Sequence, residues 1–100
     1  MIKHIVMWNF KDEAEGMQKP EILAKVADSL NALKGKIPVL RDLEVGASVT
    51  SGDMHYDMAL IVTVDKPEDL PVYANHPEHL KVLEFMNKVR IARAVADIEV

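Results

Sequence analysis

The side chains best suited to acid/base chemistry lie in one stretch, residues 73–86, which reads YANHPEHLKVLEFM. It contains Tyr73 and two of the four histidines, His76 and His79, just before and inside an apolar run. Imidazole and phenol groups transfer protons without a metal or an organic cofactor. The same groups also serve as helix caps and as hydrogen-bonded core residues, so the elements that position them decide between these roles.

His79 belongs to a predicted helix over residues 77–90. At roughly 100° per residue, His79 falls in the apolar stripe of this helix with Val82 and Met86, opposite the charged side chains. We therefore expect His79 to be largely buried, facing the core or a cavity in it. Burial disfavours the charged imidazolium and lowers its pKa below the usual value of about 6.5.

His76 directly precedes Pro77, a residue that favours the first position of a helix. Either His76 or Asn75 then occupies the cap position, where a side chain satisfies a free backbone amide. We interpret His76 as a structural residue. His55 falls in a turn ahead of a strand, and we expect it to be exposed to solvent.

His4 and Tyr73 are the other candidates for a site that includes His79. His4 shares one row of the first predicted strand with Val6 and Trp8, and on the helix side of the sheet this row would bring His4 toward His79. Tyr73 lies six residues before His79, across an expected break between two helical segments, so spacing alone leaves its direction open. For both histidines, a buried and hydrogen-bonded imidazole is the alternative to a catalytic one.

The hydrophobic pattern predicts a single domain over residues 1–100 with the element order β-α-β-β-α-β. This order is the ferredoxin-like arrangement, an α+β fold with two helices on one face of a four-stranded antiparallel sheet. The segment KDEAEG is expected to be a polar loop. Alternation predicts strands over residues 2–10, 39–49, 56–64 and 92–100. Helical spacing predicts helices over residues 20–33 and 77–90 and one short helical piece over residues 67–74.

The predicted strands are apolar on both faces. In the first strand Ile5 and Met7 lie opposite the row of His4, and in the third Ala59 and Ile61 lie opposite Leu60. A sheet with helices on one face normally exposes polar residues on the other. Because an uncovered apolar sheet is an association surface, we expect a homodimer in which two sheets pack face to face.

Composition excludes several classes of protein. The 100 residues are 49% hydrophobic with a net charge of -4, and no basic block suggests nucleic acid as a partner. The absence of cysteine excludes disulfides and zinc–thiolate sites. The first residues are too interrupted by polar side chains for a signal peptide, so we expect a cytoplasmic protein that does not interact with membranes. No spacing of residues indicates a metal, phosphate loop or other cofactor site.

Four segments in order, IKHIVMWNFKDE, LKGKIPVLRDLEVG, YANHPEHLKVLEF and the closing ADIEV, resemble the stress-responsive dimeric A/B barrel family across nearly the whole chain. The resemblance implies a ferredoxin-like protomer whose sheet pairs with that of a second copy to close a dimeric α/β barrel. Many family members are described as stress-associated and have no assigned activity. Some plant members are polyketide cyclases, which close a ring by an intramolecular aldol-type step without a metal or cofactor.

The resemblance to those cyclases implies a catalytic pair formed by Tyr73 and His79, with His4 in the same pocket between sheet and helices. A further histidine that they carry near the start of the third strand corresponds to Met58 in this chain. The chain therefore departs from the cyclase pattern at one of its polar positions.

Two functions stay open on this sequence. In the first, a small apolar carbonyl compound is the ligand, His79 is the general base, Tyr73 donates a hydrogen bond to the developing enolate, and His4 polarises a second oxygen or relays the proton. In the second, the protein is a non-catalytic stress-associated dimer that binds a ligand or supports assembly, which requires only an apolar pocket. An oxygenase, as found among other dimeric α/β barrels, is a third function for which no residue gives a specific signal.

Overall fold

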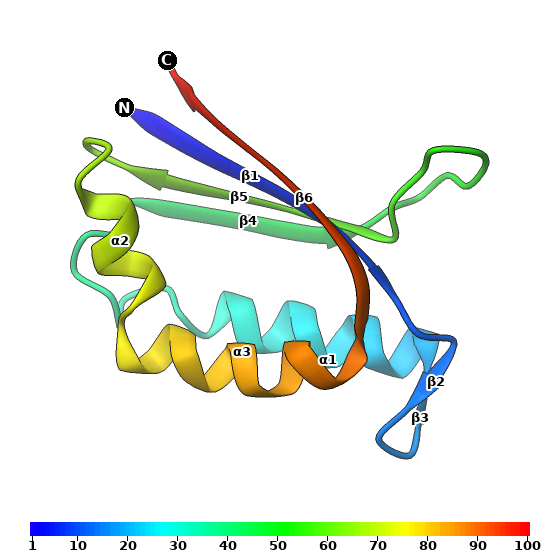
Figure 1. Ribbon diagram of the computed structural model, residues 1–100. Helices are drawn as coiled ribbons and strands as arrows, with labels where there is room; N and C mark the ends of the chain where they lie inside the picture. Colours follow the sequence, from blue (N-terminus) through cyan, green and yellow to red (C-terminus); the bar gives the residue numbers. More distant parts are fainter.

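A four-stranded antiparallel sheet with strand order β4-β5-β1-β6 organises the computed structural model, which describes residues 1–100. Helices α1 and α3 run side by side under one face of this sheet, α2 lies at one end, and the other face is uncovered (Figure 1). The prediction of an α+β fold with ferredoxin-like topology is confirmed. The elements are β1 (Ile2–Phe10), β2 (Glu13–Ala14), β3 (Met17–Gln18), α1 (Lys19–Asn31), β4 (Asp42–Ala47), β5 (Met58–Val64), α2 (Asp69–Ala74), α3 (Pro77–Val89) and β6 (Arg90–Glu99).

The core lies between the sheet and the two long helices. Because strand side chains alternate between faces, every second residue of β5, starting at Met58, is buried beneath the helices, and β1 buries Val6, Trp8 and Phe10 in the same way. Helical spacing gives α1 and α3 one buried stripe each. The buried positions of the helices are Ile22, Val26, Leu30, Val82, Met86 and Val89.

Several local features differ from the sequence-based expectation: β5 begins at Met58 instead of residue 56, and β6 begins at Arg90 instead of residue 92. The strand predicted from residue 39 begins only at Asp42, because the Leu40 amide donates to the carbonyl of Ile37 (3.0 Å) in a turn that buries Ile37. The expected polar loop KDEAEG forms a small hairpin, β2 and β3. Its two turn residues, Glu15 and Gly16, have positive φ angles of 53° and 76°, as in the tight turns that join hairpin strands.

The start of α3 was predicted correctly. The Nδ1 atom of His76 accepts a hydrogen bond from the Glu78 amide (3.1 Å), and Pro77 occupies the first turn. His76 is therefore the structural cap of the helix. This capped start ends the short helix α2 and sets the direction in which α3 leaves it.

The uncovered face of the sheet is apolar. Strand register places Ile5 between Ile61 and Ala96, and places Met7 between Ala59 and Ala94. In the single chain Met7 is 38% exposed. The alternation of the strands thus gives one row that is buried under the helices and a second apolar row that nothing in the chain covers. A contiguous apolar surface of this kind is typical of an association site.

Asp57 links the end of β1 to the start of β5 through hydrogen bonds. Its carboxylate accepts a hydrogen bond from the Phe10 amide (2.8 Å) and lies 3.2 Å from the Lys19 ammonium. Its own amide donates to the carbonyl of Trp8 (2.9 Å). One partly buried side chain therefore connects two central strands and the first helix.

We expect Asp57→Ala to lower the free energy of unfolding by about 1–3 kcal/mol, because the Phe10 amide loses its partner and Lys19 keeps only Asp12. Urea denaturation followed by circular dichroism measures the change. Asp42→Ala is the matched control, because Asp42 is exposed on β4 and no side chain pairs with it. Equal losses in the two variants would contradict this role of Asp57.

Candidate functional site

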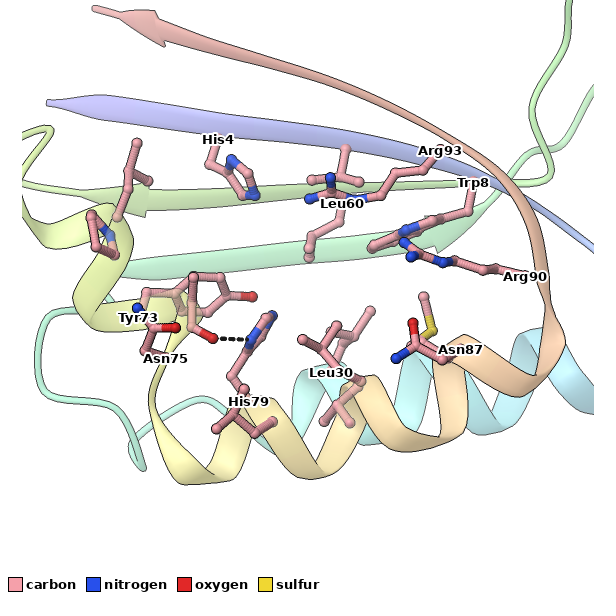
Figure 2. A pocket seen from close by; sticks show the side chains of 18 of the residues that line it. His4, Trp8, Leu30, Leu60, Tyr73, Asn75, His79, Asn87, Arg90 and Arg93 are labelled. Carbon is pink, nitrogen blue, oxygen red and sulfur yellow. Dashed lines mark hydrogen bonds between the residues drawn. The ribbon is translucent and has the colours of Figure 1, made fainter.

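A cavity of about 630 Å³ lies between the helix side of the sheet and helices α2 and α3. Figure 2 shows its side chains converging from β1, β5 and β6 above and from the helices below. Its central walls are apolar and are formed by residues such as Val6, Leu60 and Val82. A volume of this size is within the range of small-molecule sites, which combine apolar walls with a few convergent polar groups.

The three residues singled out from the sequence all line this cavity. His4 comes from β1, Tyr73 from α2 and His79 from α3. The ring centroids of Tyr73 and His79 are 4.6 Å apart, and those of His4 and Tyr73 are 6.3 Å apart. Residues that are far apart in the sequence thus form one cluster at one end of the cavity (Figure 2).

His79 presents a single unprotonated nitrogen in its neutral form. Its Nδ1 atom lies 2.8 Å from the carbonyl oxygen of Ala74. A carbonyl oxygen only accepts, so Nδ1 carries the proton and Nε2 holds the free lone pair. The side chain is partly buried rather than fully enclosed, because it lines the cavity instead of packing into the core.

Burial lowers the pKa of His79 below 6.5, although its hydrogen bond to the Ala74 carbonyl acts in the opposite direction. Electrostatic interactions with the nearby His4 and Arg93 lower the pKa of His79 further. A lowered pKa keeps the imidazole neutral at pH 7, and a neutral imidazole accepts a proton. This direction agrees with the expectation from the helical pattern.

Tyr73 is 2% exposed, and its hydroxyl is the one buried side-chain polar atom without a hydrogen-bond partner. Burial raises the pKa of Tyr73 to about 12, against a smaller opposing effect of the positive charge of Arg93. The phenol therefore stays protonated and has a hydrogen bond to donate. Figure 2 shows the hydroxyl directed toward the cavity beside the His79 ring.

Asp97 joins this cluster and was not identified from the sequence. Its carboxylate lies 2.5 Å from Nδ1 of His4. Because a carboxylate accepts hydrogen bonds, Nδ1 of His4 carries the proton in this contact, and Nε2 takes no part in it. Asp97 lies opposite His4 in the pairing of β1 with β6. Only this register, which the sequence does not reveal, brings the two together.

Arg90 and Arg93 also line the cavity and were also missed. Both come from β6, where Arg93 pairs with Trp8 and Arg90 with Phe10. The sequence signal was the alternation of β6, which places Arg93, Val95 and Asp97 on one side, but the face could be assigned only from the register.

The structure contains no group of three or more His, Asp or Glu side chains arranged to hold a metal ion. No helix has both the length and the apolar character needed to cross a bilayer.

Comparison with known proteins assigns the chain, rather than the site, to a family. The model of the stress-responsive A/B barrel domain matches residues 2–100. The chain belongs to this family. The resemblance predicted from the four sequence segments is thereby confirmed.

Among its relatives, olivetolic acid cyclase from Cannabis sativa is 30% identical over 81 residues, which cover 79% of this chain and 76% of the cyclase. An uncharacterised protein from Streptomyces coelicolor is 34% identical over 79 residues, which are 79% of each chain. A crystal structure from Bacteroides fragilis, described as a dimeric protein of unknown function with a ferredoxin-like fold, superposes with a TM-score of 0.87 at 30% identity and covers 99% of this chain and 95% of that one.

The lowered pKa of His79 predicts a pH-dependent stability. Between the folded-state pKa and about 6.5 the unfolded chain binds more protons than the folded one, so the free energy of unfolding should fall as the pH drops through this window. NMR titration of the imidazole carbon protons should give a pKa below 6.5 for His79, with His79→Gln used to assign its signals. The same variant should lose the corresponding part of the pH dependence in urea denaturation. A His79 pKa at or above 6.5 would contradict the burial argument.

Proposed function

We propose that the protein is a homodimeric A/B barrel that performs cofactor-free acid/base chemistry on a small carbonyl compound, in the manner of a polyketide cyclase. One observation carries the proposal: the ring of His79, whose Nε2 is free in the neutral form, lies 4.6 Å from the ring of Tyr73, whose hydroxyl is buried and unpaired, in one cavity. A base and a hydrogen-bond donor at this separation suit the removal of a proton next to a carbonyl group. The relationship to olivetolic acid cyclase supports the same class of reaction.

The reaction would proceed in two steps. Nε2 of His79 takes a proton from the carbon next to a carbonyl group, and the electron pair moves onto the carbonyl oxygen, where the Tyr73 hydroxyl donates a hydrogen bond to the enolate. The enolate carbon then forms a bond to a second carbonyl carbon of the same molecule. The oxygen of that second carbonyl becomes an alkoxide and takes the proton back from the imidazolium of His79.

His4 and Asp97 would assist the second carbonyl. A carboxylate that holds the Nδ1 proton of an imidazole favours protonation at the other nitrogen, as in hydrolase triads. His4 would then be able to polarise the second oxygen through Nε2. The close contact of Asp97 with His4 gives His4 a support that its position in the sequence did not suggest.

A non-catalytic binding module is the second candidate, and Met58 is the observation that favours it. Met58 is 1% exposed, near the point where the related cyclases are expected to carry a further histidine. A buried thioether transfers no proton, so one polar group of that pattern is replaced by core packing. The two candidates differ in what the loss of His79 does to turnover and to binding.

We expect the wild-type protein to accelerate exchange of the methyl protons of acetophenone for deuterium in D2O, measured by NMR or mass spectrometry. His79→Gln should lower this rate by about 10²–10⁴-fold, since it removes the general base. Ligand binding, read from the fluorescence of Trp8 in the cavity wall, should be retained in this variant. His55→Gln is the control, because His55 is exposed in the loop before β5. Binding without any exchange in the wild type would favour the non-catalytic module.

The homodimer in this proposal rests on the uncovered apolar face of the sheet, and the related Bacteroides fragilis protein is described as dimeric. Stable interfaces of this kind bury upward of about 2,000 Å² in total. We expect Met7→Arg to dissociate the dimer, because a charge would be buried without a partner between two sheets. Sedimentation equilibrium at sub-micromolar concentration checks this, with Ala24→Arg on the exposed side of α1 as the control. A wild-type monomer at that dilution would rule out the interface.

A further inference from the structure

Arg90 and Arg93 give the cavity a cationic end that the proposed reaction does not use. Both residues line the cavity, and Figure 2 shows Arg90 extending from β6 into the space between the sheet and α3, while Arg93 runs along the sheet toward Leu60. None of the ion pairs of the protein includes either guanidinium group. Arg41, the only other arginine, is held by Asp65 at 2.8 Å. Arg90 is partly buried and Arg93 is exposed at the edge of the cavity, and both guanidinium groups keep their donors available to an anion.

The register of β1 and β6 separates this cationic end from the acid/base end. His4 pairs with Asp97, and Trp8 with Arg93, four residues farther along β1. Four residues of a strand span roughly 13 Å. The carboxylate of Asp97 is engaged by His4 and does not neutralise Arg93. The cavity therefore has an acid/base end with polar groups for a carbonyl and a cationic end, from which the Arg93 side chain reaches back far enough for its charge to act on Tyr73 and His79.

We infer that the cavity takes an apolar molecule bearing a carboxylate, which Arg93 binds with help from Arg90 while the reacting carbonyl lies against Tyr73 and His79. This inference rests on the proposed function only for the placement of the carbonyl group. Binding of the anion itself requires no turnover. A guanidinium fork matches the two oxygens of a carboxylate, and the partly apolar surroundings strengthen the pair relative to one in water.

The charge of Arg93 also reaches the acid/base end. Burial is the main cause of the lowered pKa of His79, and the positive charge of Arg93 adds to it. A bound carboxylate would compensate this charge and raise the pKa of His79 toward its usual value. Occupation of the cationic end would thus make His79 a stronger base when a ligand is present.

The test uses Trp8, the single tryptophan of the chain, which lines the cavity beside Arg93. Binding of octanoate, octanamide and octyl phosphate to the full-length protein is followed by Trp8 fluorescence and by calorimetry. We expect octanoate to bind at least about tenfold more tightly than octanamide, and Arg93→Gln to abolish this preference. Arg93→Lys should retain part of it, and Arg41→Gln, which removes the same charge outside the cavity, should leave it unchanged.

The inference is overturned if octanamide binds as tightly as octanoate, if the preference survives Arg93→Gln, or if octanoate does not bind. A preference for octyl phosphate over octanoate that depends on Arg93 overturns the assignment of a carboxylate. His79→Gln should bind octanoate like the wild type, which keeps this test separate from that of the proposed reaction. Absence of deuterium exchange together with Arg93-dependent binding would refute the reaction and leave the anion site standing. The His79 pKa should rise both in Arg93→Gln and on binding of octanoate.

Discussion

The hydrogen bond from Nδ1 of His79 to the carbonyl of Ala74 joins the end of α2 to the first turn of α3, and the chemistry of the cavity depends on it. The last carbonyl groups of a helix lack partners within the helix, and His79 satisfies one of them. This contact fixes the tautomer of the imidazole, so that Nε2 carries the lone pair. It also holds the ring beside Tyr73, the last large side chain of α2. Without the break at His76 and Pro77, neither the free carbonyl nor the approach of the two rings would exist.

The polar end of the cavity has a cost in stability that the rest of the fold must offset. A buried hydroxyl without a partner costs about 1–3 kcal/mol relative to a hydrogen-bonded one, and Tyr73 carries such a hydroxyl. The lowered pKa of His79 likewise means that the folded protein disfavours the protonated ring. Groups that are costly in the folded protein and favourable toward a ligand are typical of functional sites. Burial of the alternate residues of β5 on the helix side of the sheet offsets these costs, because these side chains are almost fully buried.

Sequence patterns predicted the parts of the site that depend on local periodicity. The helical spacing of residues 77–90 predicted that His79 lies on the apolar side of α3. The alternation of β1 predicted that His4 shares a face with Val6, and Pro77 indicated that the helix cap lies at His76 or next to it. Asp97 and Arg93 were missed because their roles depend on which residues of β1 they face. That register is a tertiary property, and a shift of one residue would turn both side chains to the opposite face of the sheet. The hairpin of β2 and β3 was missed for a different reason, since Glu15 is an unfavourable residue for a positive φ angle.

The two faces of the sheet are linked through β1 and β6. His4 and Asp97 face the cavity, while the next pair along the ladder, Ile5 and Ala96, belongs to the uncovered apolar face. Strand β6 is an edge strand with β1 as its only neighbour, so the side chains it contributes to the site are held by one ladder alone. Edge strands open more readily than central ones because they lack a second partner. A second protomer packed on the apolar face would restrain the uncovered side of β6 and thereby hold Asp97 and Arg93 in register. His79 and Tyr73, which come from the helices, do not depend on this restraint. Dimerisation would therefore affect the positions of Asp97 and Arg93 first, and the position of His79 only secondarily.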